Sequence, residues 1–131
     1  MPTVAKTFYF AYSHRLQGHP GLCKNYHGHN GKAEIRVNDQ VNHTTGMVID
    51  FDDISQTVGK WIKENLDHSS ILQVGDPLLE GLPGHRVTVL DGPPTAENIA
   101  LLILMKARNF LNIHDISVKV WETDDCWAEV P

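Results

Sequence analysis

Two histidines and a cysteine stand close together in the segment Cys23–His29, whose sequence is CKNYHGH. If the segment is extended, His27 and His29 point to the same side, because side chains alternate along a strand. Gly28 between them has no side chain, so the backbone can pass close to a ligand. Two imidazoles that converge in this way can share a metal ion, and the segment therefore predicts a metal site.

A third histidine, His14, ends a segment rich in aromatic and β-branched residues. If this segment and the one that carries His27 and His29 are neighbouring strands of a hairpin, the three imidazoles come within reach of one ion. Three histidines with an open fourth position are typical of catalytic zinc sites, whereas four protein ligands are typical of structural ones. A lone histidine is more often a core or capping residue, so it is the trio together that favours a metal.

Cys23 has two interpretations. As a fourth ligand it would close the site and make a zinc ion structural. As a free thiol near a metal cation and histidines, it would lose its proton near neutral pH and act as a base or a nucleophile. The residues alone leave this choice open. Cys126 has no such neighbours in the sequence, and we expect it to be a half-buried small residue.

Two acidic groups have both a chemical and an ordinary interpretation. Asp67 precedes His68 after a predicted helix, where a turn would let the carboxylate orient the imidazole and raise its basicity. The ordinary alternative is a histidine that favours the helix dipole. Glu122, at the end of a predicted strand, can accept two parallel hydrogen bonds from the amidine-like edge of a heterocycle. Taken alone, each residue fits the ordinary interpretation better, which for Glu122 is a solvated strand end.

Alternating apolar residues predict the strands that position these groups. The pattern is clearest from Lys32 to Asn38, where every second residue is apolar, as in a half-buried strand of an antiparallel sheet. Similar patterns predict strands at Thr3–Ser13, Ile116–Trp121 and Trp127–Val130, and Met47–Ile49 is also expected to be extended.

Helical spacing replaces this alternation in two places, Ile54–Leu66 and Ile99–Phe110. Thr95 is the expected N-cap of the second helix. Between the two helices, the connection from Gly75 to Pro94 is expected to be mostly irregular, with one short apolar run at Val87–Leu90. Two helices on one face of an antiparallel sheet make an α+β sandwich, whose other face is often buried against a partner subunit.

The length and the composition limit the classes of protein to which the chain can belong. Residues 1–131 suit one domain without repeats, and a net charge of −5 disfavours binding to a nucleic-acid backbone. No apolar run is long enough to span a membrane, and the N-terminus lacks the apolar core of a signal peptide. Two cysteines do not make a disulfide framework, so we expect a cytoplasmic protein.

In this order, the motifs resemble the 6-pyruvoyltetrahydropterin synthase / 6-carboxytetrahydropterin synthase family. They extend over nearly the whole chain and are specific in combination: Phe10–Leu16, Cys23–His29, Gly46–Phe51, Leu66–His68, Pro94–Asn98 and Trp121–Thr123. The spacer of three residues between Cys23 and His27 is similar to that of bacterial 6-carboxytetrahydropterin synthases. The residues Ser69–Leu72 and the long connection from Gly75 to Pro94 depart from the family pattern.

The resemblance implies the tunnelling fold, with a four-stranded antiparallel sheet and two helices that oligomerise into a β-barrel, usually as a homohexamer. It implies zinc ligands at His14, His27 and His29, and a catalytic role for Cys23. It also implies an Asp–His dyad at Asp67 and His68, and a pterin-anchoring carboxylate at Glu122. In the family, the cysteine and the dyad meet across a subunit interface.

The implied activity is that of a zinc-dependent lyase. It converts 7,8-dihydroneopterin triphosphate to 6-carboxy-5,6,7,8-tetrahydropterin, acetaldehyde and triphosphate in queuosine and 7-deazapurine biosynthesis. One alternative is a 6-pyruvoyltetrahydropterin synthase, which eliminates triphosphate without loss of carbon. Another is a non-catalytic, zinc-stabilised oligomer that binds pterins. Basic residues that could bind the triphosphate are Arg15, Lys24 and Arg86.

Overall fold

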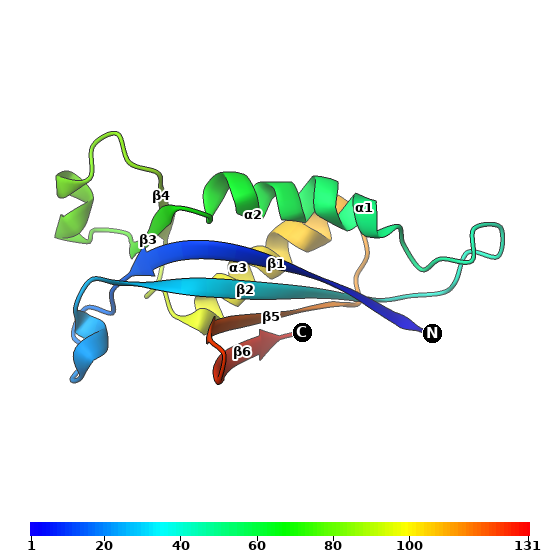
Figure 1. Ribbon diagram of the computed structural model, residues 1–131, viewed down its shortest axis with the longest axis horizontal. Helices are drawn as coiled ribbons and strands as arrows, with labels where there is room; N and C mark the ends of the chain where they lie inside the picture. The colour runs from blue at the N-terminus through cyan, green and yellow to red at the C-terminus, as the bar shows by residue number, and fades with distance from the viewer.

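The chain forms an α+β fold in which a curled sheet carries two helices (Figure 1). A computed structural model describes all of residues 1–131. The strands are β1 (Thr3–His14), β2 (His27–Asn38), β3 (Ser69–Gln73), β4 (Val87–Leu90), β5 (Ile116–Thr123) and β6 (Cys126–Val130). The first helix combines α1 (Phe51–Ile54), the π-helical turn η2 (Ser55–Gly59) and α2 (Lys60–Asn65). The second is α3 (Ala96–Leu111), and two short 3-10 turns are η1 (Leu22–Lys24) and η3 (Pro77–Gly81).

The sheet has six strands in the order β4-β3-β1-β2-β5-β6, so the expected number of four was wrong. It is also mixed rather than antiparallel, because β3 pairs in parallel with both β1 and β4. The four N-terminal residues of β3 are all buried, so this strand lacks the polar–apolar alternation that marks a half-buried strand. Val87–Leu90 forms β4, whereas Met47–Ile49, expected to be extended, lies outside every strand.

The hairpin of β1 and β2 is the part of the fold that positions the histidines. Its register pairs His14 with His27 and Tyr12 with His29, and it continues without a break to Thr3 opposite Asn38. The expected hairpin neighbours are therefore confirmed. Because the strands alternate, the three histidines occupy positions on the same face as the core residues.

One hydrophobic core joins this face of the sheet to both helices. Ile54, Val58 and Ile62 of the first helix are fully buried, as are inward residues of α3 and of the central strands. The N-terminal ends of both helices are capped by side chains, as the sequence indicates for the second. Thr95 accepts a hydrogen bond from the Asn98 amide at 3.2 Å, and Asp50 accepts one from the Asp52 amide at 2.8 Å.

The other face of the sheet is open. Tyr9 and Trp127 are 75% and 54% exposed on it, and the ammonium groups of Lys32 and Lys119 lie over the ring of Trp121. Cys126 is exposed, not half-buried, because it begins the edge strand β6. No helix of the chain combines the length and the apolar character that crossing a membrane requires.

The connection from β3 to α3 is more ordered than its sequence indicates. It contains η3 and β4, and it is held to the end of β1 by an ion pair between the half-buried Arg15 and the buried Asp76. Asp76 also accepts a hydrogen bond from the Leu78 amide at 2.8 Å, which caps η3. The hydrogen bonds from Arg15 keep the pKa of Asp76 below its ordinary value, although burial opposes them.

Candidate active site

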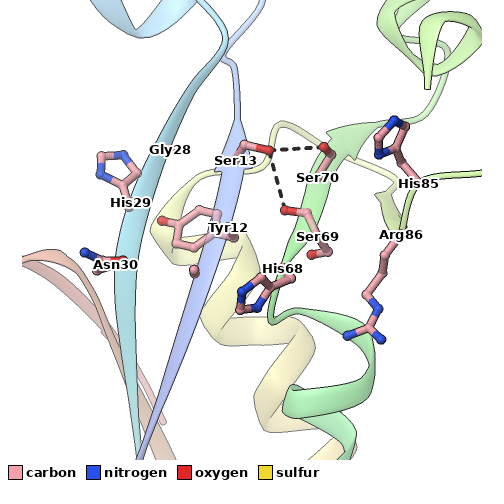
Figure 2. Close-up of a pocket in the computed structure, with 11 residues that line it drawn as sticks. Tyr12, Ser13, Gly28, His29, Asn30, His68, Ser69, Ser70, His85 and Arg86 are labelled. Carbon is pink, nitrogen blue, oxygen red and sulfur yellow. Dashed lines mark hydrogen bonds between the residues drawn. The ribbon is translucent and has the colours of Figure 1, made fainter.

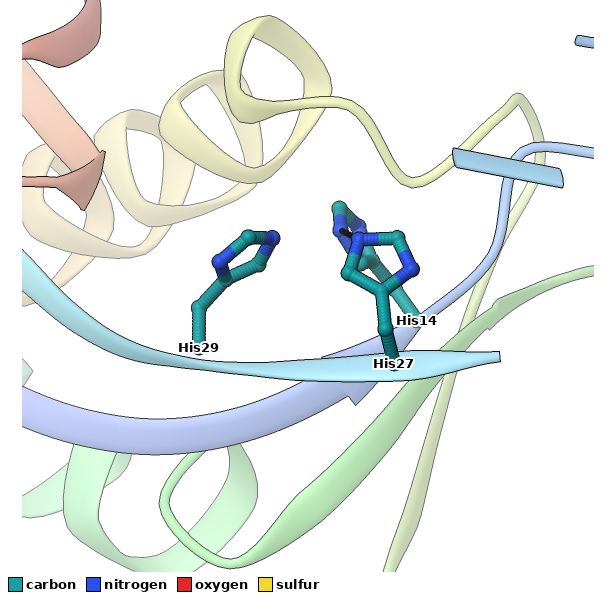
Figure 3. Close-up of side chains that lie close together, drawn as sticks. All are labelled: His14, His27 and His29. Carbon is teal, nitrogen blue, oxygen red and sulfur yellow. Dashed lines mark hydrogen bonds between the residues drawn. The ribbon is translucent and has the colours of Figure 1, made fainter. Parts of the chain in front are cut away.

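The three predicted histidines converge on one point at the end of the β1–β2 hairpin (Figure 3). One ring nitrogen from each of His14, His27 and His29 lies within 4.8 Å of the others. The Nε2 atoms of His14 and His27 are 3.1 Å apart. Nitrogens at such distances can bind a single ion placed between them, because zinc–nitrogen bonds are about 2.0–2.1 Å long.

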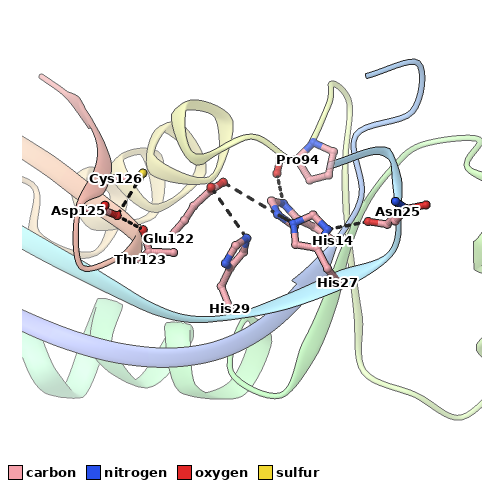
Figure 4. A network of polar contacts seen from close by, with 9 residues as sticks. All are labelled: His14, Asn25, His27, His29, Pro94, Glu122, Thr123, Asp125 and Cys126. Atoms are coloured by element: carbon pink, nitrogen blue, oxygen red, sulfur yellow. Dashed lines mark hydrogen bonds and ion pairs between the residues drawn. The ribbon is translucent and has the colours of Figure 1, made fainter. Parts of the chain in front are cut away.

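Backbone carbonyl groups set the orientation of two of these imidazoles (Figure 4). His14 Nδ1 lies 2.7 Å from the Pro94 carbonyl oxygen, and His27 Nδ1 lies 2.6 Å from that of Asn25. A carbonyl oxygen only accepts, so each Nδ1 carries the proton and each Nε2 presents its lone pair. Metal-binding histidines are typically held in this way by a second hydrogen bond.

The third imidazole leaves a buried nitrogen without a partner. His29 Nε2 is inaccessible to solvent and makes no hydrogen bond. Burial lowers the pKa of both His14 and His29, although the charge of Glu122 opposes this effect, so the neutral, ligating form is favoured. A buried ring nitrogen without a hydrogen-bond partner, next to two oriented imidazoles, is more typical of a metal site than of a packed core.

Cys23 lies apart from these nitrogens. It is in η1, in the loop between β1 and β2, and its carbonyl accepts a hydrogen bond from the Leu16 amide at 2.8 Å. The cluster of ligand atoms within 4.8 Å of one another contains the three histidines and not the Cys23 sulfur. The thiol is free and half-buried, and the geometry favours its role outside the ligand shell.

Glu122 lies on the same face as the histidines, at the end of β5 (Figure 4). Its carboxylate oxygens are 4.0 Å from His14 Nε2 and 3.9 Å from His29 Nε2. It also lines a hollow of about 240 Å³ with Thr95 and Glu97 at the start of α3. The carboxylate therefore borders both the candidate metal site and this hollow.

Asp67 and His68 form a hydrogen-bonded pair in the turn after α2. His68 Nδ1 lies 3.0 Å from Asp67 Oδ2, and the other carboxylate oxygen accepts from the Ala11 amide at 2.8 Å. Burial raises the pKa of Asp67, but the hydrogen bonds from Ala11 and His68 outweigh it and leave this pKa below its ordinary value. The left-handed backbone of His68, with φ of 55°, brings the two side chains together.

The dyad and the histidine trio lie on opposite sides of the sheet. His68 is 81% exposed and lines a pocket of about 430 Å³ on the open face (Figure 2). The same pocket is lined by Ser13, Gly28 and Asn30, which alternate with the inward residues of β1 and β2, and it is also bordered by Tyr12 and His29 of those strands. One chain therefore assembles the trio and Glu122 but does not bring His68 to them.

Several groups at the site were not predicted from the sequence. The Pro94 and Asn25 carbonyls carry no side-chain signal, and Asp76 is 61 residues from its partner Arg15. Of the basic residues expected near the triphosphate, Arg15 binds the Asp76 carboxylate and Arg86 binds backbone carbonyls. Tyr12 lies beside His14 because of the register of the hairpin, which the sequence pattern does not specify.

Comparison with known proteins identifies relatives of the whole chain. Residues 3–131 match the family described as 6-pyruvoyl tetrahydropterin synthase. A protein of Rickettsia bellii named 6-carboxy-5,6,7,8-tetrahydropterin synthase is 36% identical, over 92% of this chain and 94% of its own length. One of Haemophilus influenzae with the same name is 30% identical, over 96% of each.

Solved structures agree on the fold. An uncharacterized protein from Wolinella succinogenes is 26% identical, with a TM-score of 0.79 over 98% of this chain and 97% of that one. The 6-pyruvoyl tetrahydropterin synthase of Plasmodium falciparum is 21% identical, with a TM-score of 0.78 over 98% and 96%.

Proposed function

Because the chain belongs to the 6-pyruvoyl tetrahydropterin synthase family, we propose that it is a 6-carboxy-5,6,7,8-tetrahydropterin synthase. It takes 7,8-dihydroneopterin triphosphate and water, and it releases 6-carboxy-5,6,7,8-tetrahydropterin, acetaldehyde and triphosphate. The names of relatives that are 30–36% identical over nearly the whole chain support this choice of product. The product would serve the biosynthesis of queuosine or another 7-deazapurine.

One observation carries the proposal of a metal-dependent enzyme. His29 Nε2 is buried without a partner, next to two imidazoles whose Nε2 lone pairs face the same space. Three imidazoles without a fourth protein ligand suit zinc in a catalytic site. When bound there, zinc supplies Lewis-acid polarisation of the side-chain oxygens of the substrate.

We propose roles for three other residues, and their positions support these roles. Cys23, outside the cluster of ligand nitrogens, moves protons at the side-chain carbons of the substrate. His68, oriented by Asp67, is the acid and base on the opposite side. Glu122, which faces the hollow beside the histidines, accepts hydrogen bonds from the amino-pyrimidine edge of the pterin.

These roles require more than one subunit. The trio and His68 face opposite sides of the sheet, so His68 can act only at the site of a neighbouring copy. The exposed Tyr9 and Trp127 on the open face, and the two unpaired sheet edges at β4 and β6, support such an assembly. We propose a homohexamer in the cytoplasm, with active sites at subunit interfaces.

Mass-spectrometric product analysis tests this function. The zinc-loaded protein is incubated with 7,8-dihydroneopterin triphosphate, and we expect 6-carboxytetrahydropterin together with acetaldehyde. A 6-pyruvoyl product without acetaldehyde would instead identify a 6-pyruvoyltetrahydropterin synthase. Bound zinc and bound pterin without any turnover would identify a non-catalytic binding module.

A further inference from the structure

Tyr12 carries a buried hydroxyl group that has no hydrogen-bond partner. The residue is 4% exposed, and its hydroxyl is one of three buried side-chain polar atoms without a partner. The others are the His29 Nε2 described above and Asn38 Oδ1, which is an acceptor. A buried hydroxyl donor without a partner costs free energy of folding. We therefore look for an acceptor that could bind it when the site holds a metal or a ligand.

The ring of Tyr12 lies directly beside the histidines. Its centroid is 5.2 Å from that of His14 and 5.6 Å from that of His29. The ring crosses β2 above Gly31, where an added Cβ would lie only 2.8 Å from Tyr12 Cε1. Glycine at this position therefore makes room for the phenol, whose oxygen is turned toward β2 (Figure 2).

The Tyr12 ring extends across β2 at Gly31, and Glu122 lies on the next strand of the sheet, β5. The last residue pair between β2 and β5 joins Lys32 to Trp121, so the next residue of β5 is Glu122 and the preceding residue of β2 is Gly31. Glu122 is thus the carboxylate nearest along the sheet to the phenol, and it is 27% exposed. An ionised carboxylate that is largely buried needs donors.

The Glu122 carboxylate faces two ring nitrogens that would become ligands of a bound metal. Its oxygens face His14 Nε2 and His29 Nε2 at 4.0 and 3.9 Å. The proton of His14 is on Nδ1, and a ring nitrogen bound to a metal has no proton to donate, so neither nitrogen is a donor to the carboxylate once a metal is bound. The hydroxyl of Tyr12 then remains as a buried donor on this face.

We propose that Tyr12 is a positioning residue for Glu122. With a metal on the three histidines, the Tyr12 hydroxyl donates a hydrogen bond to the Glu122 carboxylate. That bond holds the carboxylate in the orientation in which it accepts the paired N–H groups of a pterin. The inference rests on the proposed function, because it assumes that Glu122 binds the pterin.

Tyr12→Phe tests this inference, since it removes the hydroxyl and keeps the ring. Tyr9→Phe is the matched control, because Tyr9 is on the same strand and is 75% exposed on the other face. Zinc content is measured, and neopterin affinity is titrated by fluorescence with the zinc-loaded proteins. We expect Tyr12→Phe to keep its zinc and to bind neopterin about tenfold more weakly, as for loss of a hydrogen bond to a charged group. Tyr9→Phe should match the wild type.

A double-mutant cycle with Glu122→Gln shows whether the hydroxyl acts through Glu122. We expect Tyr12→Phe to have little further effect on neopterin affinity in the Glu122→Gln protein. We also expect it to leave the melting temperature of the metal-free protein unchanged or higher, because an unpartnered hydroxyl is removed.

Three results would overturn the inference. They are an unchanged neopterin affinity in Tyr12→Phe, an equal loss in the wild-type and Glu122→Gln backgrounds, and a lower melting temperature of the metal-free variant. The first two leave the proposed function intact if the wild type binds neopterin and turns over substrate. A wild type that binds zinc but no neopterin would overturn the inference and the proposed function together.

Discussion

At the scale of single residues, the site depends on how the imidazoles are held rather than on the number of histidines. The chain has eight histidines, of which His14, His27 and His29 share one space. Carbonyl groups orient two of them, and the third has a buried nitrogen without a partner. Because these nitrogens are preorganised, a metal can bind with little rearrangement.

Cys23→Ala distinguishes a catalytic thiol from a metal ligand. We expect the variant to retain its zinc and to lose turnover by at least about 100-fold, as for the loss of a general acid–base group. His29→Ala, in contrast, should lose most of its zinc. Metal content and product formation are measured for both, with Cys126→Ala as the control, because Cys126 is a free, exposed thiol at the start of β6. Loss of zinc from Cys23→Ala would place Cys23 in the ligand shell.

At the scale of elements, two features position the site. The uninterrupted pairing of β1 and β2 places His14 opposite His27, and the Arg15–Asp76 pair attaches the long β3–α3 connection to the end of β1. The same connection supplies the Pro94 carbonyl that orients His14. The ion pair therefore helps to hold one wall of the site in place.

Asp76→Asn should lower the free energy of unfolding by about 2 kcal/mol at pH 7, because it leaves Arg15 without its carboxylate. The pKa of Asp76 is lower in the folded protein than in the unfolded chain. The stabilisation is therefore complete above about pH 4–5 and is lost as the pH falls through the folded pKa.

Urea unfolding at several pH values measures this effect. The difference between wild type and Asp76→Asn should shrink as the pH falls from about 5 toward 2. Asp91→Asn, an exposed position on the same connection, is the control and should unfold like the wild type. A difference that does not depend on pH would show that the Asp76 charge is not responsible.

At the scale of the whole molecule, the metal site adjoins a hydrophobic core that is built from apolar side chains. The core cluster contains twenty buried apolar residues, and one of them, Tyr12, packs beside His14 and His29. The fold therefore has enough buried apolar surface to persist without a metal. In this respect it differs from small zinc modules, which unfold when the metal is removed.

Chelation should abolish turnover but leave a folded protein. We expect the metal-free protein to keep its circular dichroism spectrum and a cooperative thermal transition, at a lower temperature because zinc stabilises only the folded state. Adding zinc back should restore activity. Unfolding on chelation would instead favour a zinc ion whose role is structural.

If Cys23 of one subunit and His68 of another form one active site, two inactive variants should restore activity when their subunits mix. Cys23→Ala and His68→Ala subunits are coexpressed with different tags, and oligomers that carry both tags are isolated. With random mixing, about a quarter of the interfaces join an intact Cys23 to an intact His68, so about a quarter of the activity should return. Cys23→Ala with His29→Ala is the control without recovery, because both changes affect the same side of the interface. No recovery in the first pair would mean that the two groups do not meet between subunits.

The sequence by itself determined the inward face of the β1–β2 hairpin and the histidine trio on it. Alternation along a strand is a local property, so the spacing of His27 and His29 is enough to place them together. The helices and the Thr95 cap were predicted for the same reason, because helical periodicity and capping involve residues at most a few positions apart.

Only the tertiary structure decided the groups that are distant in sequence. Strand β3 is buried along most of its length and pairs in parallel, so neither its pattern nor a short turn reveals its partner. The Arg15–Asp76 pair and the Pro94 carbonyl depend on the path of a long connection. The placement of Tyr12 beside the histidines, and of His68 on the opposite face, follows from strand register and sheet packing, which no local pattern specifies.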